Sequence, residues 1–176
     1  MGESCYYQQG PGVGAGLHLG ADGRTLLATR SDAAGANADV WAIDLRSSQA
    51  TRSTFASAPS DIQGALSPDG TRIAVSASTV GGWGAASLWI QSTSGSGSRQ
   101  SVLEKVSFHV AGWSPDGALL VGETPEPETG FDVTYVAVAD PSTLVRLTSS
   151  PFDERAPALS PNGRWIAYQS NEAGRN

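Results

Sequence analysis

The chain is poor in lysine, cysteine and histidine. Among its 176 residues there is one cysteine, one lysine and two histidines, and charged residues make up 16%. Because Cys5 is alone, a disulfide within the chain is excluded. The net charge is −6, and Lys105 is the single lysine. A nucleic-acid partner is therefore not expected, since neutralising phosphates requires clustered Lys and Arg.

Long hydrophobic runs are also missing. No apolar stretch approaches the roughly 18 residues of a membrane-spanning helix, so we expect no membrane insertion by this segment. Residues 1–7 have neither the basic region nor the apolar core of a signal peptide.

The motifs of common catalytic and cofactor sites are absent as well. The glycines of residues 10–16 alternate every second position, and no helix pattern follows them as a dinucleotide-binding loop requires. A nucleophile elbow requires a glycine two residues after the serine, but the residue two positions after Ser114 is Asp116. His18 and His109 lack the spacing of a metal-binding pair. We expect no catalytic residue, no cofactor and no metal, and therefore no enzyme activity in this chain.

One acidic segment, residues 123–132, is the densest group of carboxylates. Carboxylates are ligands for Ca²⁺, but the spacing does not match an EF-hand loop and two prolines stiffen the segment. A solvated, extended loop is the default interpretation.

What the sequence does contain is one turn signature in four copies. The four glycines, Gly23, Gly70, Gly117 and Gly163, are spaced by 47, 47 and 46 residues. A fixed period of this length marks a repeat architecture. The first copy departs from the pattern, because Gly20 and Ala21 replace the Ser-Pro of the others. The predicted turn residues are Asp22, Gly23, Pro68, Asp69, Gly70, Pro115, Asp116, Gly117, Pro161, Asn162 and Gly163.

Each signature predicts a tight β-hairpin. Proline presets the backbone at the second turn position, Asp or Asn tolerates the third, and Gly takes the left-handed position that follows. Apolar runs flank the turns, and the runs after them are continuously apolar, which predicts strands covered on both faces. A buried helix is the alternative, but runs of four to six residues between Gly and Pro are too short for one.

Two further strands follow in each copy. The third carries an aromatic residue that we place at one repeated position, as Trp41, Trp89 and Tyr135. A weaker fourth strand is predicted in residues 51–55, 100–103 and 144–147. The unit is then a four-stranded antiparallel meander of about 45 residues, the size of a β-propeller blade.

The predicted fold class is therefore all-β: a partial, open β-propeller with three complete blades and one truncated blade. We expect a flexible, Gly-rich lead-in over residues 1–16 and a propeller fragment over residues 17–176. The predicted blades are 17–63, 64–110, 111–156 and 157–176. Because a propeller closes with about 4 to 8 blades, we expect a piece of a larger propeller whose open blade faces favour self-association.

These residues resemble the TolB-like, WD-repeat-like β-propeller family over about residues 17–176. The resemblance rests on the segment Leu66–Ala74, on Leu88-Trp89-Ile90 and on the return of the turn after Trp113. The last copy, from Leu159 to Asn176, resembles the propellers fused to bacterial serine/threonine protein kinases. The resemblance implies a protein-binding role and favours a periplasmic or extracytoplasmic location, while the compartment itself stays unknown. No kinase motif lies in this chain.

Candidate binding residues follow from the blade geometry. The turns occupy one face of the propeller, so the crossings between blades collect on the opposite face, where variable loops usually bind partners. Polar residues there should ring a central channel, or they serve only to satisfy loop backbone and water. Trp83, on a Gly-rich loop, either anchors a partner or folds back onto its blade. The candidates are Asp61, Gln63, Trp83, His109, Glu154 and Arg155.

Two functions remain open at this stage. The first is a non-enzymatic protein- or peptide-binding module of a larger bacterial protein, including the sensory region of a protein kinase. The second is the gating propeller of a prolyl oligopeptidase-like serine peptidase whose catalytic domain lies outside this chain. We expect replacement of Trp83 or His109 by alanine to leave the fold intact under the first hypothesis.

Overall fold

The residues that the structure describes form four antiparallel β-sheets. The computed structural model describes residues 16–31, 38–55, 60–78, 86–94, 98–104 and 106–174. Within these ranges the first sheet contains β1 (Leu17–Leu19), β2 (Thr25–Ser31), β3 (Ala38–Asp44) and β4 (Ala50–Arg52). The second contains β5 (Ser60–Leu66), β6 (Arg72–Ser78), β7 (Ala86–Ser92) and β8 (Gln100–Leu103). The third contains β9 (His109–Trp113), β10 (Leu119–Glu126), β11 (Gly130–Ala137) and β12 (Leu144–Arg146). The fourth contains β13 (Glu154–Leu159) and β14 (Ile166–Ser170).

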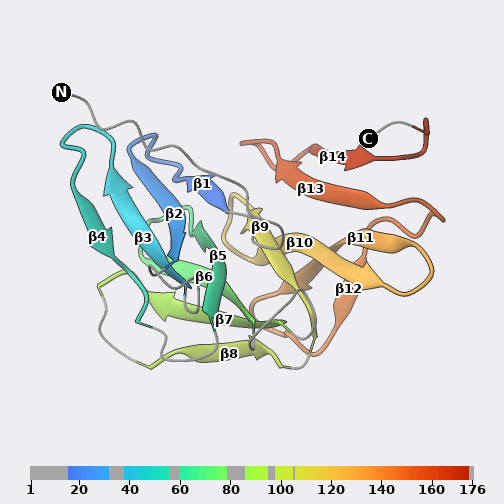
Figure 1. Cartoon of the computed structure of the whole chain (residues 1–176), viewed down its shortest axis with the longest axis horizontal. Coiled ribbons are helices and arrows are strands. Elements are labelled where there is room, and N and C mark those ends of the chain that lie inside the picture. Colours follow the sequence, from blue (N-terminus) through green and yellow to red (C-terminus); the bar gives the residue numbers. More distant parts are fainter. Residues whose placement is uncertain are drawn as a thin grey trace.

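The sheets are arranged like blades around a common centre (Figure 1). Within each sheet the strands pair in chain order. The first strands of successive sheets, β1, β5, β9 and β13, contact one another in turn and form the inner layer. The described strands do not close into a ring. The all-β class, with three four-stranded units and a shorter fourth, is confirmed.

The four predicted turns share one hydrogen-bonding pattern. In each, the glycine N–H donates to the carbonyl three residues earlier, and Gly23, Gly70, Gly117 and Gly163 have φ between 61° and 71°. The Asp or Asn side chain accepts the N–H two residues later. In the first copy, Asp22 Oδ1 also accepts the N–H of Thr25. In the second copy the equivalent N–H, that of Arg72, donates to Ser67 Oγ instead. The first turn therefore forms without the serine.

The second strand of the second sheet is buried on both faces, as its continuous apolar run predicts. Ile73 and Val75 pack against Leu27 and Val40 of the first sheet. Ala74, which points the other way, belongs to a second cluster shared with the third sheet. The other buried members of that cluster are Ala65, Leu88, Ile90, Val102, Leu103, Phe108, Val110, Trp113, Leu120 and Val136.

The predicted aromatic repeat of the third strands is correct for two copies and wrong for one. Trp41 and Trp89 lie opposite the residue five positions after the turn glycine, whereas Tyr135 lies opposite Val121, four positions after it. Since strand side chains alternate between faces, Tyr135 points to the other side of its sheet. Thr134 holds the aromatic position instead, opposite Gly122.

The ring of Phe108, which immediately precedes β9, lies beside Gly122, on the face where an aromatic residue of β11 was predicted. Phe108 is fully buried beside Gly122, and a Cβ on Gly122 would lie 2.8 Å from the Phe108 ring. Gly122 is therefore required by a close approach, and the aromatic bulk at this junction comes from the crossing into β9 rather than from β11.

The sheets begin slightly ahead of the blade boundaries placed from the sequence. β5, β9 and β13 start at Ser60, His109 and Glu154, whereas the predicted boundaries fall at 64, 111 and 157. The difference arises because the inner strands extend N-terminally past the short apolar pair that precedes each turn. The lead-in over residues 1–15, with Cys5, lies outside the described residues.

Candidate binding site at the entry of the inner strands

Three of the predicted candidates occupy one register position in successive sheets. Each lies opposite the second-strand residue six positions after the turn glycine: Gln63 opposite Ser76, His109 opposite Glu123, and Arg155 opposite Gln169. This position is the first residue of β9 and the second of β13, at the end of the sheet away from the turns, whereas in β5 Gln63 lies at the middle of the strand. The same backbone place therefore carries an amide, an imidazole and a guanidinium group.

The other candidates do not share this register position. Glu154 lies opposite Ser170, and the backbone of Asp61 takes the equivalent place opposite Ala77. The side chain of Asp61 and all of Trp83 lie outside the described residues. His109, Glu154 and Arg155 meet at the junction of the third and fourth sheets, whereas Gln63 belongs to the second sheet.

His109 is buried at this junction. Its side chain is 1% exposed, and its ring lies 5.6 Å from the Phe131 ring, centroid to centroid. His109 Nδ1 is 3.8 Å from Glu123 Oε1. A group so enclosed does not meet solvent directly. His109 therefore contributes to the site by packing near Phe131 and not by contacting a partner directly.

Arg155 covers the outer side of the same ring. Its guanidinium carbon lies 3.8 Å from the Phe131 centroid, within the range of a cation–π contact. Arg155 Nε also donates to both carboxylate oxygens of Asp153, at 2.8 and 3.0 Å. The side chains of Arg155 and Asp153 are 42% and 25% exposed. They form the part of the cluster that a partner can touch.

Asp153 joins three chain segments at the site. Its Oδ1 accepts the N–H of Phe131 at 2.9 Å, and its own N–H donates to Asn171 Oδ1 at 3.0 Å. Gly130 allows this approach, because it has φ of 97° and a Cβ there would lie 2.9 Å from Asp153 Oδ1. The start of β11, the residue before β13 and the residue after β14 are thus held in one arrangement.

Glu123 makes a contact that recurs between sheets. Its Oε2 accepts the N–H of Ala156 at 2.6 Å, and Ser76 Oγ, at the equivalent position, accepts the N–H of Val110 at 2.8 Å. Ala156 has φ of 50°, a left-handed conformation that costs free energy in a residue with a side chain. It lies at the bulge of β13. The Glu123 carboxylate helps to hold that strained backbone beside Arg155.

Two carboxyl groups near this junction are buried. Glu154 is 3% exposed, and its Oε1 accepts a hydrogen bond from Ser150 Oγ. Burial raises the pKa of Asp132, and the nearby Glu126 and Glu154 add to that effect. Arg146 offsets it in part, with Nη1 3.7 Å from Asp132 Oδ2 and Nη2 2.6 Å from Glu126 Oε2. An equivalent pair, Arg52 with Asp39, is found in the first sheet.

The accessible groups of the site are an ion pair over an aromatic ring, which can contact a polar or aromatic segment of another molecule. Among the described residues, no group of three or more His, Cys, Asp or Glu side chains is placed to hold a metal ion. Within the same ranges, no helix has the length and hydrophobicity needed to cross a membrane.

Sequence analysis missed two members of the cluster. Glu123 and Phe131 belong to the acidic segment for which a solvated loop was the default interpretation, yet both lie in paired strands, β10 and β11. The signal for Glu123 is its distance from the turn, since it follows Gly117 by the same six residues that separate Ser76 from Gly70.

No protein-family model matches the sequence, and no curated protein matches it significantly. Solved structures are similar in fold. A putative TolB from Agrobacterium tumefaciens superposes with a TM-score of 0.73 and 22% identity, over 96% of this chain and 57% of that one. TolB from Acinetobacter baumannii gives 0.70 and 14%, over 87% and 36%. A prolyl endopeptidase gives 0.59 and 15%, over 89% and 25%.

The chain thus spans little more than half the length of the first of these proteins and smaller shares of the other two. At these identities the similarity establishes the architecture. The chain has the fold of the β-propellers found in TolB and in prolyl oligopeptidase-type enzymes, in an arc that is not closed.

Proposed function

We propose that this chain is a non-enzymatic binding module, a β-propeller segment of a larger bacterial protein that holds a peptide or protein segment at the entry of its inner strands. One observation supports the proposal above all. Equivalent register positions carry Gln63, His109 and Arg155 on the same backbone scaffold. A repeated scaffold whose side chains differ from blade to blade suits recognition, because one blade can present an accessible group, here Arg155, at the position where another carries a buried one, here His109.

The accessible centre of this site is the ion pair of Arg155 and Asp153 over Phe131. Arginine and aromatic residues are over-represented among the residues that dominate binding energy at protein interfaces. The guanidinium group is fixed by two hydrogen bonds and by the ring, so little of its freedom remains to be lost when a partner binds. Such preorganisation favours a defined partner over non-specific adhesion.

Selection of a random peptide library against the immobilised chain tests the proposal. The affinity of the selected peptide is then measured for the wild type, for Arg155→Ala and for Arg164→Ala. Arg164 lies exposed in the turn of the same sheet, at the opposite end, and serves as the matched control. We expect Arg155→Ala to weaken binding about tenfold or more, or ~1.4 kcal/mol, and Arg164→Ala to leave it unchanged. Equal affinities for all three proteins would contradict the proposal.

A second candidate function is supported by the similarity to a prolyl endopeptidase. In that case the chain is the gating propeller of a serine peptidase, and its entry face admits peptides to a catalytic domain elsewhere in the protein. The gene sequence following Asn176 distinguishes the two. A downstream Gly-x-Ser-x-Gly followed by Asp and His favours the peptidase. A kinase domain upstream favours the sensory module, for which the resemblance of the last repeat is the present support.

A further inference from the structure

Two exposed apolar faces lie at the two ends of the arc of sheets (Figure 1). On the first sheet, Leu17 and Leu19 of β1 are 66% and 54% exposed, and we call these residues the first-sheet face. On the fourth sheet, Trp165 is 72% exposed, and Ala158 and Ala167 are exposed as well. These three residues are the fourth-sheet face. Contiguous exposed apolar groups indicate an interaction site.

The register shows that the first-sheet face points away from the second sheet. Leu27 packs against the second sheet. Its neighbour Leu26 therefore points to the opposite side, because strand side chains alternate. Leu19 lies directly opposite Leu26, and Leu17, two residues earlier in β1, shares its side. The outer side of the first sheet thus carries a row of leucines.

The fourth-sheet face repeats a surface that is buried inside the chain. In the second sheet, Ala65 lies opposite Ala74, which is four residues after the turn glycine, and in the fourth sheet Ala158 lies opposite Ala167 in the same register. Ala65 and Ala74 are fully buried in the cluster that contains Trp113 of the third sheet. Trp113 Nε1 also donates to the Ala65 carbonyl at 2.9 Å. The same alanine pair is therefore occupied in the second sheet and open in the fourth.

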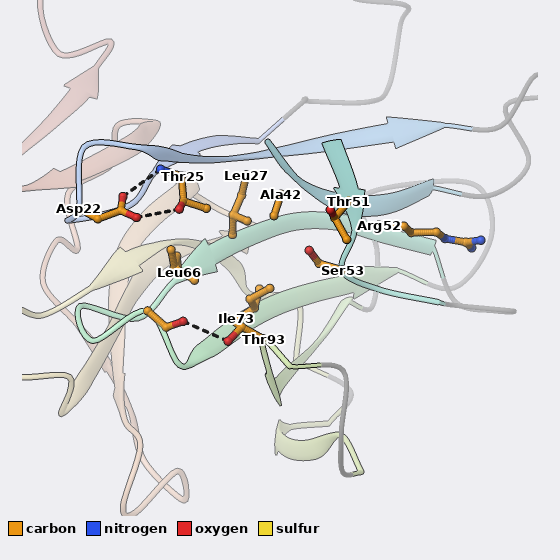
Figure 2. Close-up of a pocket in the computed structure, with 11 residues that line it drawn as sticks. Asp22, Thr25, Leu27, Ala42, Thr51, Arg52, Ser53, Leu66, Ile73 and Thr93 are labelled. Carbon is orange, nitrogen blue, oxygen red and sulfur yellow. Dashed lines mark hydrogen bonds between the residues drawn. The ribbon is translucent and has the colours of Figure 1, made fainter. Parts of the chain in front are cut away.

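The first-sheet face carries the residue type that occupies such a surface. Trp113 and Leu66 each end an inner strand, opposite the second-strand residue three positions after the turn glycine, and Leu19 has the same position in β1. Figure 2 shows Leu66 and Ile73 facing the space between the first and second sheets. Leu66 and Trp113 are 7% and 6% exposed, against 54% for Leu19. Leu19 thus has the position of a junction residue without a junction.

Trp165 extends the correspondence to the rim of the contact. In the second sheet, Arg72 follows the turn glycine by two residues, and its guanidinium carbon lies 4.8 Å from the Trp113 ring centroid. Trp165 has the same position after the turn glycine of the fourth sheet. It is therefore placed to cover whichever residue takes the Trp113 position on this face. Tryptophan is among the residues that contribute most to binding at protein interfaces.

From this correspondence we propose that the first-sheet face of one copy of the chain packs on the fourth-sheet face of a second copy. Leu19 then lies on Ala158 and Ala167, beneath Trp165, and the stack of sheets continues from one copy to the next. A second copy is the occupant because one chain carries both faces in the registers that pack together within it. The contact is head-to-tail, since it joins two different surfaces. It is separate from the entry site proposed above.

Light scattering after size exclusion, at millimolar concentration, tests the contact with three variants. The wild type should have a mass above that of the monomer. Leu19→Arg blocks the first-sheet face and Ala167→Arg the fourth-sheet face, because each buries an unpaired charge in the contact. Each should weaken association at least about tenfold. Leu147→Arg is the matched control, since Leu147 is 49% exposed but lies in the third sheet, and it should associate as the wild type does.

Both blocking positions are exposed in a single copy, so these variants should fold, which circular dichroism checks. Leu17→Arg and Ala158→Arg are the substitutes if either does not. An equimolar mixture of the two blocked variants is the decisive sample. The intact fourth-sheet face of Leu19→Arg should bind the intact first-sheet face of Ala167→Arg, and a heterodimer should form although neither variant associates alone.

Four results would overturn the proposal. A monomeric wild type would mean that something other than a second copy covers these faces. Undiminished association of Leu19→Arg alone, or of Ala167→Arg alone, would mean that the contact does not join the two faces. A mixture that stays monomeric would show that the two intact faces do not bind each other.

Discussion

His18 accepts a hydrogen bond through its imidazole Nδ1 from the backbone N–H of Leu66, 3.3 Å away, across the junction of the first and second sheets. On the other side of the same inner strand, Trp113 Nε1 donates to the carbonyl of Ala65 at 2.9 Å. Side chains of the two neighbouring inner strands thus bond to the two ends of one peptide unit of β5 and link the inner strands of the first three sheets.

The His18 bond should make stability depend on pH. Burial lowers the pKa of His18 below its ordinary 6.5, and Nδ1 must be unprotonated to accept the bond. The unfolded chain then binds a proton more readily than the folded one, so this stability is fully present above about pH 6.5 and is lost as the pH falls below it. Urea unfolding between pH 8 and pH 5 measures the effect.

His18→Gln is the control for that experiment, because an amide oxygen can accept the same N–H but does not titrate. We expect the free energy of unfolding of this variant to vary less with pH over the same range. Identical pH profiles for the two proteins would show that protonation of His18 does not change the free energy of unfolding.

Replacing His109 by alanine should destabilise the protein. Its ring is 1% exposed and packs near Phe131, so truncation leaves a cavity and costs roughly 2–4 kcal/mol, as for other large buried side chains. This differs from the sequence-based expectation that the fold is indifferent to His109. Thermal unfolding compares His109→Ala with Gln63→Ala, the equivalent but half-buried position, for which we expect a much smaller loss. Similar losses at both positions would contradict the packing role.

Gly130 should tolerate substitution less well than the glycine of a predicted turn. Gly23→Ala introduces a left-handed alanine with no atom within 4 Å of its Cβ, and should cost about 1–2 kcal/mol. Gly130→Ala adds a contact of 2.9 Å with Asp153 Oδ1, so it should cost at least roughly 1 kcal/mol more. Chemical denaturation measures both. Equal losses would mean that Asp153 moves away freely and does not fix the entry site.

Glu123 should act on stability through a single hydrogen bond. Its Oε2 accepts the N–H of Ala156, an exposed residue, and a hydrogen bond of this kind contributes about 0.5–1.5 kcal/mol. We expect Glu123→Ala to lose stability in that range and Glu123→Gln, which keeps an acceptor oxygen, to lose much less. Denaturant unfolding of both variants tests this, and equal losses would show that the charge or bulk of Glu123 matters rather than the bond.

The turns, and through them the fold, were predictable from sequence because their chemistry is local. Pro, Asp and Gly restrict the backbone over four residues, so Ser67–Gly70 and Ser114–Gly117 predict the hairpins without any tertiary contact. The same locality fails for Tyr135. A one-residue change in loop length between β10 and β11 moves a strand residue to the opposite face, and no sequence pattern fixes that length.

The site was predictable only in part. Blade geometry placed Gln63, His109 and Arg155 at one end of the sheets, and the register supports their equivalence. The burial of His109 depends on Phe131, which comes from a different strand pair. Properties that arise from packing between distant segments leave no local signal.

Amide chemical shifts of the labelled chain, recorded with and without a selected peptide, test the proposed binding face most directly. We expect the largest changes at His109, Phe131 and Arg155, at the entry of the inner strands. Changes concentrated instead at Gly23, Gly70, Gly117 and Gly163 would place the partner on the turn face and contradict binding at the entry.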